Sequence, residues 1–320
     1  MDIFCIGEIL VDFLPGAETG SYVRHAGGAP ANVAVAVARN GLKAGFCGKV
    51  GDDDFGRFLI EELKANGVVP MCGSPCDHAA TTMAFVTLTP EGERSFTFAR
   101  KPGADMFLDI DDVKNLHFET AKIIHAGSCS LSSEAAREAT VYAMRLAHER
   151  GQFVSFDVNY RDAMWNSDRK EAQKWIKQVL PLVDFLKVSQ EESCLVEDGN
   201  DLAILEQEYQ IVCTVETLGA QGANAYYKDK KIFCPPVPAN CIDATGAGDA
   251  FWGGFLSALL FQGLQCGGQP SEEMLYQAIA YASAAGSLAV RKKGAIPALP
   301  FKNEVMDILN VSSEKDKCKK

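Results

Sequence analysis

The sequence has no excess of positive charge. Lys and Arg total 31 residues against 42 of Asp and Glu, so the formal net charge is −11 at pH 7 and the isoelectric point is near 5.0. A chain of this sign is repelled by nucleic acid and by anionic membrane surfaces, and we expect neither as a partner. Any anionic ligand must therefore be attracted by local groups.

Long apolar runs and a basic N-terminal leader are also absent. No stretch approaches the roughly 18 uninterrupted apolar residues of a membrane span. Asp2 begins a short strand-like run without a preceding basic segment. We therefore expect a cytoplasmic protein. Its 320 residues suffice for one large α/β domain with a small appendage.

The eleven cysteines lack the paired spacing of a zinc site. Several lie in apolar runs, for example Cys5 and Cys47, where we expect small core residues rather than disulfide partners. The segment from Cys72 to His78 is dense enough to suggest a metal or redox pair. Because a second ligand pair is missing, a surface loop is the simpler interpretation.

Two familiar phosphate-binding motifs are missing. A Walker A loop fails because Lys43 stands where its first glycine belongs and Val50 follows Gly48-Lys49. A dinucleotide fingerprint fails because Phe251 occupies the place of its third small residue, far from the N-terminal strand. The sequence therefore argues against P-loop and NAD-binding enzymes.

A different glycine-containing segment, Asp243 to Gly254, is the most informative feature present. Gly246, Ala247 and Gly248 leave backbone N–H groups open to an anion where an apolar helix begins, so a transferring phosphoryl group could lie there. Asp249 follows directly and is either a helix cap or a general base. The neighbouring glycines favour the base, because a cap does not need bare backbone beside it.

A second glycine segment, Gly27 to Asn32, precedes the apolar stretch from Val33 to Arg39. Pro30 suits a first helical turn, and Asn32 places an amide at that helix start. Upstream, a buried strand is expected to run into a loop that ends at Asp12. Carboxylate and amide groups suit neighbouring sugar hydroxyls, so Asp12 and Asn32 are predicted to bind one polyol. Either residue alone is equally typical of a turn.

Apolar strand-like runs alternate with helical patterns along the chain, which predicts βαβ units and a parallel sheet. Such a sheet binds ligands at the carboxyl ends of its strands, where we expect Asp12, Asn159 and the loop at Asp243. Helices are predicted from Ser133 to Arg150 and from Trp175 to Leu180, and the last long helix from Met274 to Val290. The predicted strands are Asp2 to Gly7, Gly45 to Lys49, Lys122 to Ala126, Phe153 to Val158, Phe185 to Val188 and Ile211 to Thr217.

Two segments break this alternation. Thr81 to Leu88 and Arg94 to Ala99 alternate polar and apolar residues around Pro90-Glu-Gly92, which predicts an antiparallel hairpin. Ser21 to His25 is a further candidate strand. Together these segments predict a second, smaller sheet.

Both glycine segments resemble the two signatures of the PfkB/ribokinase family of carbohydrate kinases, with a pattern most similar to bacterial fructokinases. The resemblance implies a ribokinase-like three-layer α/β/α sandwich with a mainly parallel central sheet and a small β-sheet lid. It also implies transfer of the γ-phosphoryl group of ATP to a hydroxymethyl hydroxyl of a sugar. The implied reaction converts D-fructose to fructose 6-phosphate with Asp249 as base. Further matching segments are Gly48 to Gly56, Phe156 to Arg161 with Trp165, and Arg291 to Ala295.

The resemblance further implies a single kinase domain, residues 1–320, in which segments near 11–27 and 81–100 form the lid. In related kinases the exposed edge of this lid often serves as a dimer contact. A homodimer through the lid is therefore expected.

For the sugar, Arg161 offers planar, charge-assisted donors, but a structural ion pair with Asp157 or Asp162 is its alternative. Arg100 has the alternative of a solvated charge at a strand end. The implied sugar-binding residues are Asp12, Gly28, Asn32, Arg100, Asn159 and Arg161.

On the nucleotide side, the segment from Lys187 to Glu192 resembles the family's Asn-x-x-Glu motif, with Ser189 in place of the usual Asn. Glu192 is implied to hold Mg²⁺ through a water. Gly219 and Gly222 are also typical of plain turns. The implied nucleotide-binding residues are Lys187, Glu192, Thr217, Gly219, Gly222 and Ser283. An implied K⁺ site comprises Asp243 and backbone oxygens of Thr245, Ala289, Lys292 and Gly294.

Two alternatives remain open. A 2-keto-3-deoxygluconate or 5-dehydro-2-deoxygluconate kinase would need a cationic pocket for its acidic substrate, which Arg100 and Arg161 could supply. A non-catalytic sugar sensor is the more remote alternative, because a sugar binder needs neither Asp249 nor the anion cradle.

Overall fold

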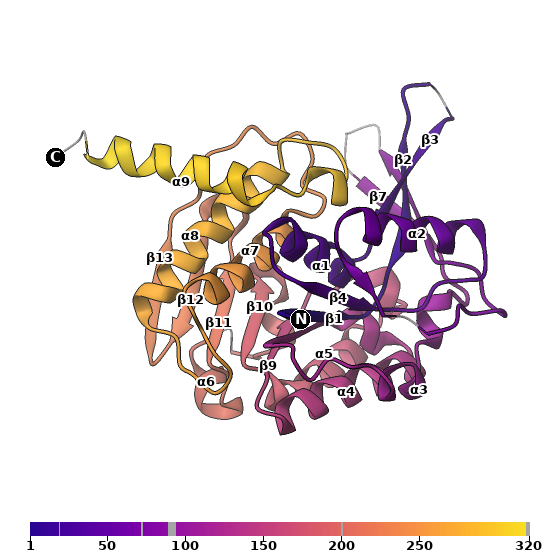
Figure 1. The fold of residues 1–320 in the computed structure, drawn as a ribbon, viewed down its shortest axis with the longest axis horizontal. Coiled ribbons are helices and arrows are strands. Elements are labelled where there is room, and N and C mark those ends of the chain that lie inside the picture. The colour runs from indigo at the N-terminus through magenta and orange to yellow at the C-terminus, as the bar shows by residue number, and fades with distance from the viewer. Residues whose placement is uncertain (19, 72, 89–93, 200, 318–320) are drawn as a thin grey trace.

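The computed structural model describes residues 1–320 except 19, 72, 89–93, 200 and 318–320 (Figure 1). The predicted turn at Pro90-Glu-Gly92 and Cys72 of the candidate metal loop lie outside the described residues. In the described part, no group of three His, Cys, Asp or Glu side chains is placed to hold a metal. No described helix is long and apolar enough to cross a membrane. The cysteines that the structure describes are free thiols, and most are buried.

Nine strands of the described chain form one large sheet. They are β1 (Ile3–Ile6), β4 (Ala44–Cys47), β5 (Val69–Pro70), β8 (Ile123–Gly127), β9 (Phe153–Asp157), β10 (Phe185–Ser189), β11 (Cys213–Thr217), β12 (Ala223–Tyr227) and β13 (Lys230–Cys234). Their order is β13-β12-β11-β10-β9-β8-β1-β4-β5. Neighbouring strands from β11 to β5 are parallel, whereas β12 and β13 form an antiparallel edge. The predicted mainly parallel sheet is confirmed.

Helices cover both faces of this sheet, so the architecture is the predicted three-layer sandwich (Figure 1). They are α1 (Ala29–Arg39), α2 (Asp54–Ala65), α3 (Ile110–Lys114), α4 (Glu134–Glu149), α5 (Arg169–Val179), α6 (Ile204–Tyr209), α7 (Ala247–Phe261), α8 (Glu272–Ala289) and α9 (Lys302–Lys317). Ile3 and Cys5 pack into the core that includes α1, α7 and α8, and Phe4 and Ile6 pack into the core that includes α4 and α5. Burial on both faces explains why most residues of the parallel strands are apolar.

Four further strands form a separate, smaller sheet at the upper right of Figure 1. They are β2 (Leu10–Pro15), β3 (Tyr22–Gly27), β6 (Met83–Leu88) and β7 (Arg94–Ala99), in the order β3-β2-β6-β7. Strands β2 and β6 are parallel, and the β2–β3 and β6–β7 pairs are antiparallel. The predicted hairpin strands and the second sheet are confirmed.

The structure corrects three local predictions. Asp12 lies within β2, where it pairs with His25 and Ala84, and not in a loop. Helix α5 begins at Arg169, six residues before the predicted start at Trp175, because the Asp168 side chain accepts a hydrogen bond from Glu171 N and caps the helix. Helix α8 is not the last long helix, because the largely polar α9 follows it.

Candidate active site

Helix α7 begins directly after the glycine segment that the sequence singled out. Gly246 has φ 75°, and a Cβ there would lie 2.9 Å from the Cα of Ala295, so glycine is required. Because the N-cap residue is Gly246, the start of this helix has no capping side chain from that position. The Ala247 N–H is used in a turn with Ala244 O (3.2 Å), so a predicted anion cradle would rely on Gly246 and Gly248.

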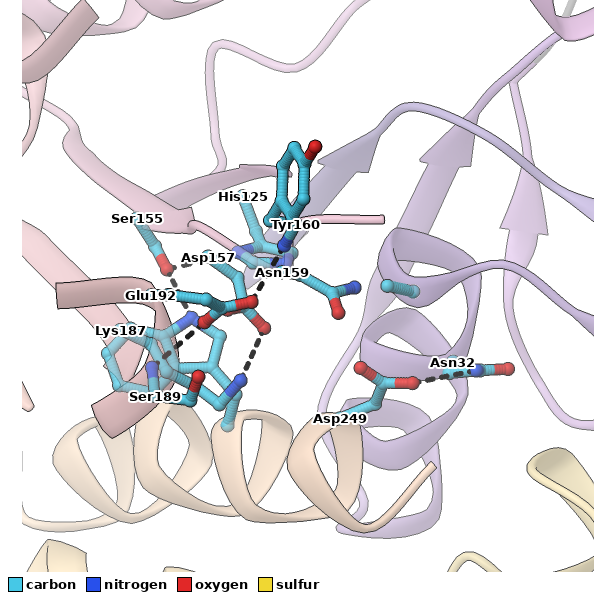
Figure 2. Close-up of polar contacts among 12 residues, drawn as sticks. Asn32, His125, Ser155, Asp157, Asn159, Tyr160, Lys187, Ser189, Glu192 and Asp249 are labelled. Carbon is cyan, nitrogen blue, oxygen red and sulfur yellow. Dashed lines mark hydrogen bonds and ion pairs between the residues drawn. The ribbon is translucent and has the colours of Figure 1, made fainter. Parts of the chain in front are cut away.

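Asp249 lies in the first turn of α7 but faces another helix. Its Oδ2 accepts a hydrogen bond of 2.8 Å from Asn32 Nδ2 on α1, across 217 positions of sequence (Figure 2). Its side chain is buried, and burial raises the pKa of Asp249, while the Asn32 hydrogen bond and the charges of Lys187 and Arg161 lower it. This contact favours the interpretation of Asp249 as a base over that of a helix cap.

Asn32 is placed by the turn that precedes it. Gly28 has φ 106°, and a Cβ there would lie 2.5 Å from Glu8 O, so the chain passes close over the end of β1 and enters α1 with Pro30 in its first turn. Asn32 is buried, and its Oδ1 has no hydrogen-bond partner among the described residues. An unpaired buried acceptor next to Asp249 is well suited to a ligand hydroxyl.

Asp12 approaches the same place from the smaller sheet. Burial and the charge of Asp249 raise the pKa of Asp12 to about 7, and the charge of Arg161 lowers it. The charges of Asp12, Arg161 and Asp249 therefore influence one another. Arg161 itself donates to Tyr160 O (2.9 Å), and its predicted alternative partners, Asp157 and Asp162, pair with other residues.

Lys187 lies under the predicted cradle. A Cβ at Gly248 would be 3.3 Å from Lys187 Nζ, and Nζ pairs with Asp157 Oδ2 at 2.7 Å in a site where both side chains are buried (Figure 2). Burial lowers the pKa of Lys187, but the charges of Asp157, Glu192 and Asp249 outweigh it and raise the pKa overall. A charged ammonium group is therefore held directly below Gly248.

Glu192 joins the ends of two neighbouring strands. Its Oε1 accepts from Tyr160 N (2.7 Å) after β9, and its Oε2 accepts from Ser189 N (2.9 Å) at the end of β10. Ser189 and Glu192 form a reciprocal capping box, which explains how a serine suffices at this position. Each carboxylate oxygen retains a lone pair, so the pair of residues suits a metal-bound water.

Asn159 lies between Asp157 and Tyr160 in sequence and has a strained backbone. Its φ is 32°, which is uncommon for a residue other than glycine, and its side chain is buried. Strain of this kind is often found at functional sites. Figure 2 shows the Asn159 amide directed away from the Lys187 pair.

A buried polar chain that the sequence analysis did not predict lies beneath Lys187. Trp252 Nε1 on α7 donates to Ser155 Oγ (2.8 Å), and Ser155 Oγ lies 3.1 Å from His125 Nδ1. Because indole N–H can only donate, Ser155 Oγ accepts from Trp252, and the tautomer of His125 sets the direction of the second hydrogen bond. Burial and the charge of Lys187 lower the pKa of His125 to about 3, so the ring is neutral. The chain ties α7 to β8 and β9.

Arg100 is not a solvated strand-end charge. Its side chain is 7% exposed, and its Nε and Nη2 both lie 2.8 Å from Asp105 Oδ2. Nη1 reaches Met164 O at 3.4 Å. The guanidinium is therefore already engaged by protein groups.

The predicted nucleotide residues gather around the end of β11 and its turn into β12. Thr217 ends β11, and Gly222, with φ 108°, packs against Cys234 O where a Cβ would clash. Gly222 is thus a turn glycine. A Cβ at Gly219 would meet nothing within 4 Å, so the space beside it is open. Ser283 on α8 lies beside the Cys234 thiol at the end of β13.

The predicted cation residues converge on the loop after α8. Asp243 is buried, its Oδ1 accepts from Thr245 N (2.7 Å), and its Oδ2 accepts from Gly294 N (2.9 Å). Ala289 ends α8, and its carbonyl accepts from Lys292 N (3.3 Å). A buried carboxylate among turn carbonyls is a donor set that suits a hard monovalent cation.

Comparisons with known proteins identify the family of this chain. The family model described as pfkB family carbohydrate kinase matches residues 1–302. The chain is 38% identical to a probable fructokinase-4 of Arabidopsis thaliana over 319 residues, which covers 96% of each protein.

Solved structures of fructokinases also resemble this chain over nearly its whole length. A fructokinase of Xylella fastidiosa with bound ATP has a TM-score of 0.86 and 32% identity, covering 98% of this chain and 99% of that one. A double-mutant fructokinase of Vibrio cholerae O395 with fructose, ADP and potassium ion bound has a TM-score of 0.84 and 33% identity, covering 96% and 98%. The fold is therefore ribokinase-like, and the chain belongs to the pfkB family of carbohydrate kinases, as an ATP-dependent sugar kinase.

Proposed function

We propose that this kinase phosphorylates D-fructose to fructose 6-phosphate with Asp249 as the general base. The observation that carries the proposal is the Asn32–Asp249 hydrogen bond, because it joins the predicted sugar clamp to the predicted phosphate cradle. A hydroxymethyl group held by Asp12 and Asn32 would lie beside Asp249. Asp249 takes its proton, the oxygen attacks the γ-phosphorus, and the bond to the bridging oxygen breaks to release ADP.

The phosphate side of the site would stabilise charge on the transferring group. The backbone N–H groups of Gly246 and Gly248, the positive end of α7 and Lys187 act together there. Lys187 is held in place by Asp157 and has further N–H donors for phosphate oxygens. Mg²⁺ bound to the nucleotide would neutralise phosphate charge, and Glu192 would hold one of its waters.

The remaining predicted residues fall into two groups. Thr217, Gly219, Gly222 and Ser283 would border the nucleotide along the β11–β12 turn and α8. Asp243, with backbone oxygens of Thr245, Ala289, Lys292 and Gly294, would bind K⁺. The potassium-bound fructokinase relative supports this second group.

The charges on the sugar side favour a neutral ketose over a sugar acid. Asp105 neutralises Arg100, and Asp12 contributes a carboxylate that would repel an acidic substrate. Arg161 and Asn159 would then bind sugar hydroxyls, and Gly28 would let the sugar approach the start of α1. A 2-keto-3-deoxygluconate or 5-dehydro-2-deoxygluconate kinase would need a free cationic side chain, and pairing with Asp105 removes Arg100 from that role and leaves only Arg161 of the two candidates. The fructokinase relatives support the same choice.

We also propose a homodimer that forms through the smaller sheet, as the lid of a single 1–320 domain. Tyr22 and Val23 on β3 are exposed, and the stacked rings of Phe13 and Phe85 lie on the same sheet. An apolar sheet surface of this kind suits pairing with a second copy. We propose the reducing cytoplasm as the location of the protein, because the cysteines in the described part of the chain are free thiols.

A kinetic panel tests the proposal. Purified protein with ATP and Mg²⁺ is assayed with fructose, ribose, 2-keto-3-deoxygluconate and 5-dehydro-2-deoxygluconate, with Asp249→Asn as the background control. We expect the highest kcat/KM for fructose, by about tenfold or more, and fructose 6-phosphate as the product by ³¹P NMR. A higher kcat/KM for either sugar acid would overturn fructose as the proposed substrate. Sugar binding without turnover would favour the non-catalytic sugar sensor.

A further inference from the structure

Two consecutive threonines at the base of strand β6 are each held by a different carboxylate, partly buried Asp53 and buried Asp105. Thr81 N donates to Asp53 Oδ2 (2.8 Å) and Thr81 Oγ1 donates to Asp53 Oδ1 (2.7 Å). Thr82 Oγ1 donates to Asp105 Oδ1. Both threonines are 1% exposed. Because adjacent side chains point to opposite sides, β6 is fixed from two directions where it leaves the large domain.

Asp105 also binds the other end of the same hairpin. Arg100 follows β7, and the Arg100–Asp105 pair is almost fully buried, with side chains 7% and 2% exposed. Gly103 lies inside this group, and a Cβ there would be 2.9 Å from both Arg100 Cγ and Asp105 Oδ1 and would clash with Thr82 Oγ1. One carboxylate therefore joins the entry and the exit of the β6–β7 hairpin in a closely packed cluster.

The cluster is connected to the strand that carries the sugar carboxylate. Val11 N donates to Thr82 O (3.0 Å), and Val11 immediately precedes Asp12 on β2. The pairing of β2 with β6 continues along the strands, and Asp12 lies opposite Ala84 of β6. A displacement of Thr82 would therefore be transmitted to Asp12.

Glu8 completes the charge distribution around the cluster. It is buried, its Oε1 accepts from Ala29 N (3.3 Å), and its Oε2 has no partner among the described residues. The pKa of Glu8 is raised to about 7, mainly by burial. The charge of Asp105 raises this pKa further, and the charge of Arg100 lowers it. Buried ion pairs gain little net stability, because desolvation offsets their attraction, but they fix geometry.

We propose that Asp105 is a positioning residue that fixes the base of the small sheet, and thereby holds Asp12 at the sugar and keeps water from the phosphoryl group. This inference rests on the proposed sugar site. It does not require Asp105 to contact the substrate. It predicts that any movement of the small sheet on sugar binding is confined to the part of the sheet beyond this fixed base.

The test compares Asp105→Asn with wild type, using the sugar that the wild-type enzyme phosphorylates. Asparagine keeps the shape but removes the charge that holds Arg100. We expect KM for the sugar to rise about 10- to 100-fold, in line with a small displacement of a binding group, while KM for ATP stays unchanged. ATP hydrolysis per sugar phosphorylated should rise, and amide exchange in β6 and β7 should quicken while that in α7 does not.

Two further variants keep the test decisive. Thr82→Val removes one hydrogen bond to Asp105 without changing charge and should act in the same direction by a smaller factor, so it serves if Asp105→Asn fails to fold. Asp111→Asn, on the exposed side of α3, is the matched control and should change none of these quantities. A purely structural Asp105 would lower thermal stability with sugar KM and the hydrolysis ratio unchanged, which would overturn the inference. A wild-type enzyme that phosphorylates no sugar would instead overturn the proposed function.

Discussion

The carboxyl edge of the large sheet and the small sheet contribute to one site in different ways. At the large sheet, Lys187 within β10 is held by its buried pair with Asp157, and Glu192 just after β10 is held by two backbone N–H groups. On the small sheet, Asp12 projects from β2, and its place depends on how that sheet is fixed to the core. The proposed phosphate side is thus preorganised, whereas the position of Asp12 on the proposed sugar side depends on the small sheet.

This difference separates two kinds of effect. Changes on the phosphate side should act on the chemical step, because its groups face charge that develops during transfer. Changes on the small sheet should act on sugar affinity, because they alter groups that hold the ground state. Substitutions on each side therefore test whether the division is real.

The largest effect is expected from Asp249→Asn, which lies where the two sides meet. Loss of the base should lower kcat by about 10²–10⁴. The measurement is steady-state turnover at saturating ATP and fructose, with the exposed Asp307→Asn as control. Near-normal turnover in a folded variant would remove Asp249 from the mechanism.

A smaller effect is expected from Gly248→Ala on the phosphate side. The added methyl group would lie 3.3 Å from Lys187 Nζ and displace either the ammonium or the phosphate. We expect kcat to fall about 100-fold with fructose KM unchanged. A change confined to fructose KM would contradict the division between the two sides.

Asp12→Ala and Asn32→Ala sharpen the comparison from the sugar side. Each would remove the buried hydrogen bonds that we propose to the sugar, and should weaken fructose use by roughly 1–3 kcal/mol, with ATP affinity little changed. Separate KM values for fructose and ATP provide the measurement. Loss of ATP binding with fructose binding intact would mean that the two ends are assigned backwards.

The smallest expected effect is a pH dependence of fructose affinity. The pKa of Asp12 is raised to about 7, so its charged, accepting form declines as pH falls below 7. KM for fructose should rise as pH falls below that value, by less than Asp12→Ala raises it, and Asp12→Asn should remove the dependence. The raised pKa of Asp249 separately lowers kcat in the same direction. A flat KM profile between pH 5 and pH 8 would argue against Asp12 as an ionised sugar ligand.

The parts of the site that are local in sequence could be predicted from it. The turn at Gly246 and the helix start at Ala29 follow from the φ preference of glycine and from proline at a first helical turn. The two sheets followed from hydrophobic alternation. Side-chain roles within such segments were only hypotheses, since nothing local distinguishes a base from a cap.

Long-range contacts could not be predicted in this way. The Asn32–Asp249 bond, the Arg100–Asp105 pair and the Trp252–Ser155–His125 chain each join residues whose partners depend on the assembled fold. Ser155 and His125 alternate with apolar residues in buried strands and carry no motif. The placement of Asp12 in a strand was missed for the same reason, because its pairing partners lie on β3 and β6.

One crosswise titration tests the central claim most directly. Fructose and a non-hydrolysable ATP analogue are each titrated calorimetrically into wild type, Asp12→Ala and Gly248→Ala. The account predicts that Asp12→Ala weakens fructose binding and leaves the nucleotide unchanged, and that Gly248→Ala leaves fructose binding unchanged. Equal losses of both ligands in both variants would contradict a site divided between a preorganised phosphate side and a lid-positioned sugar side.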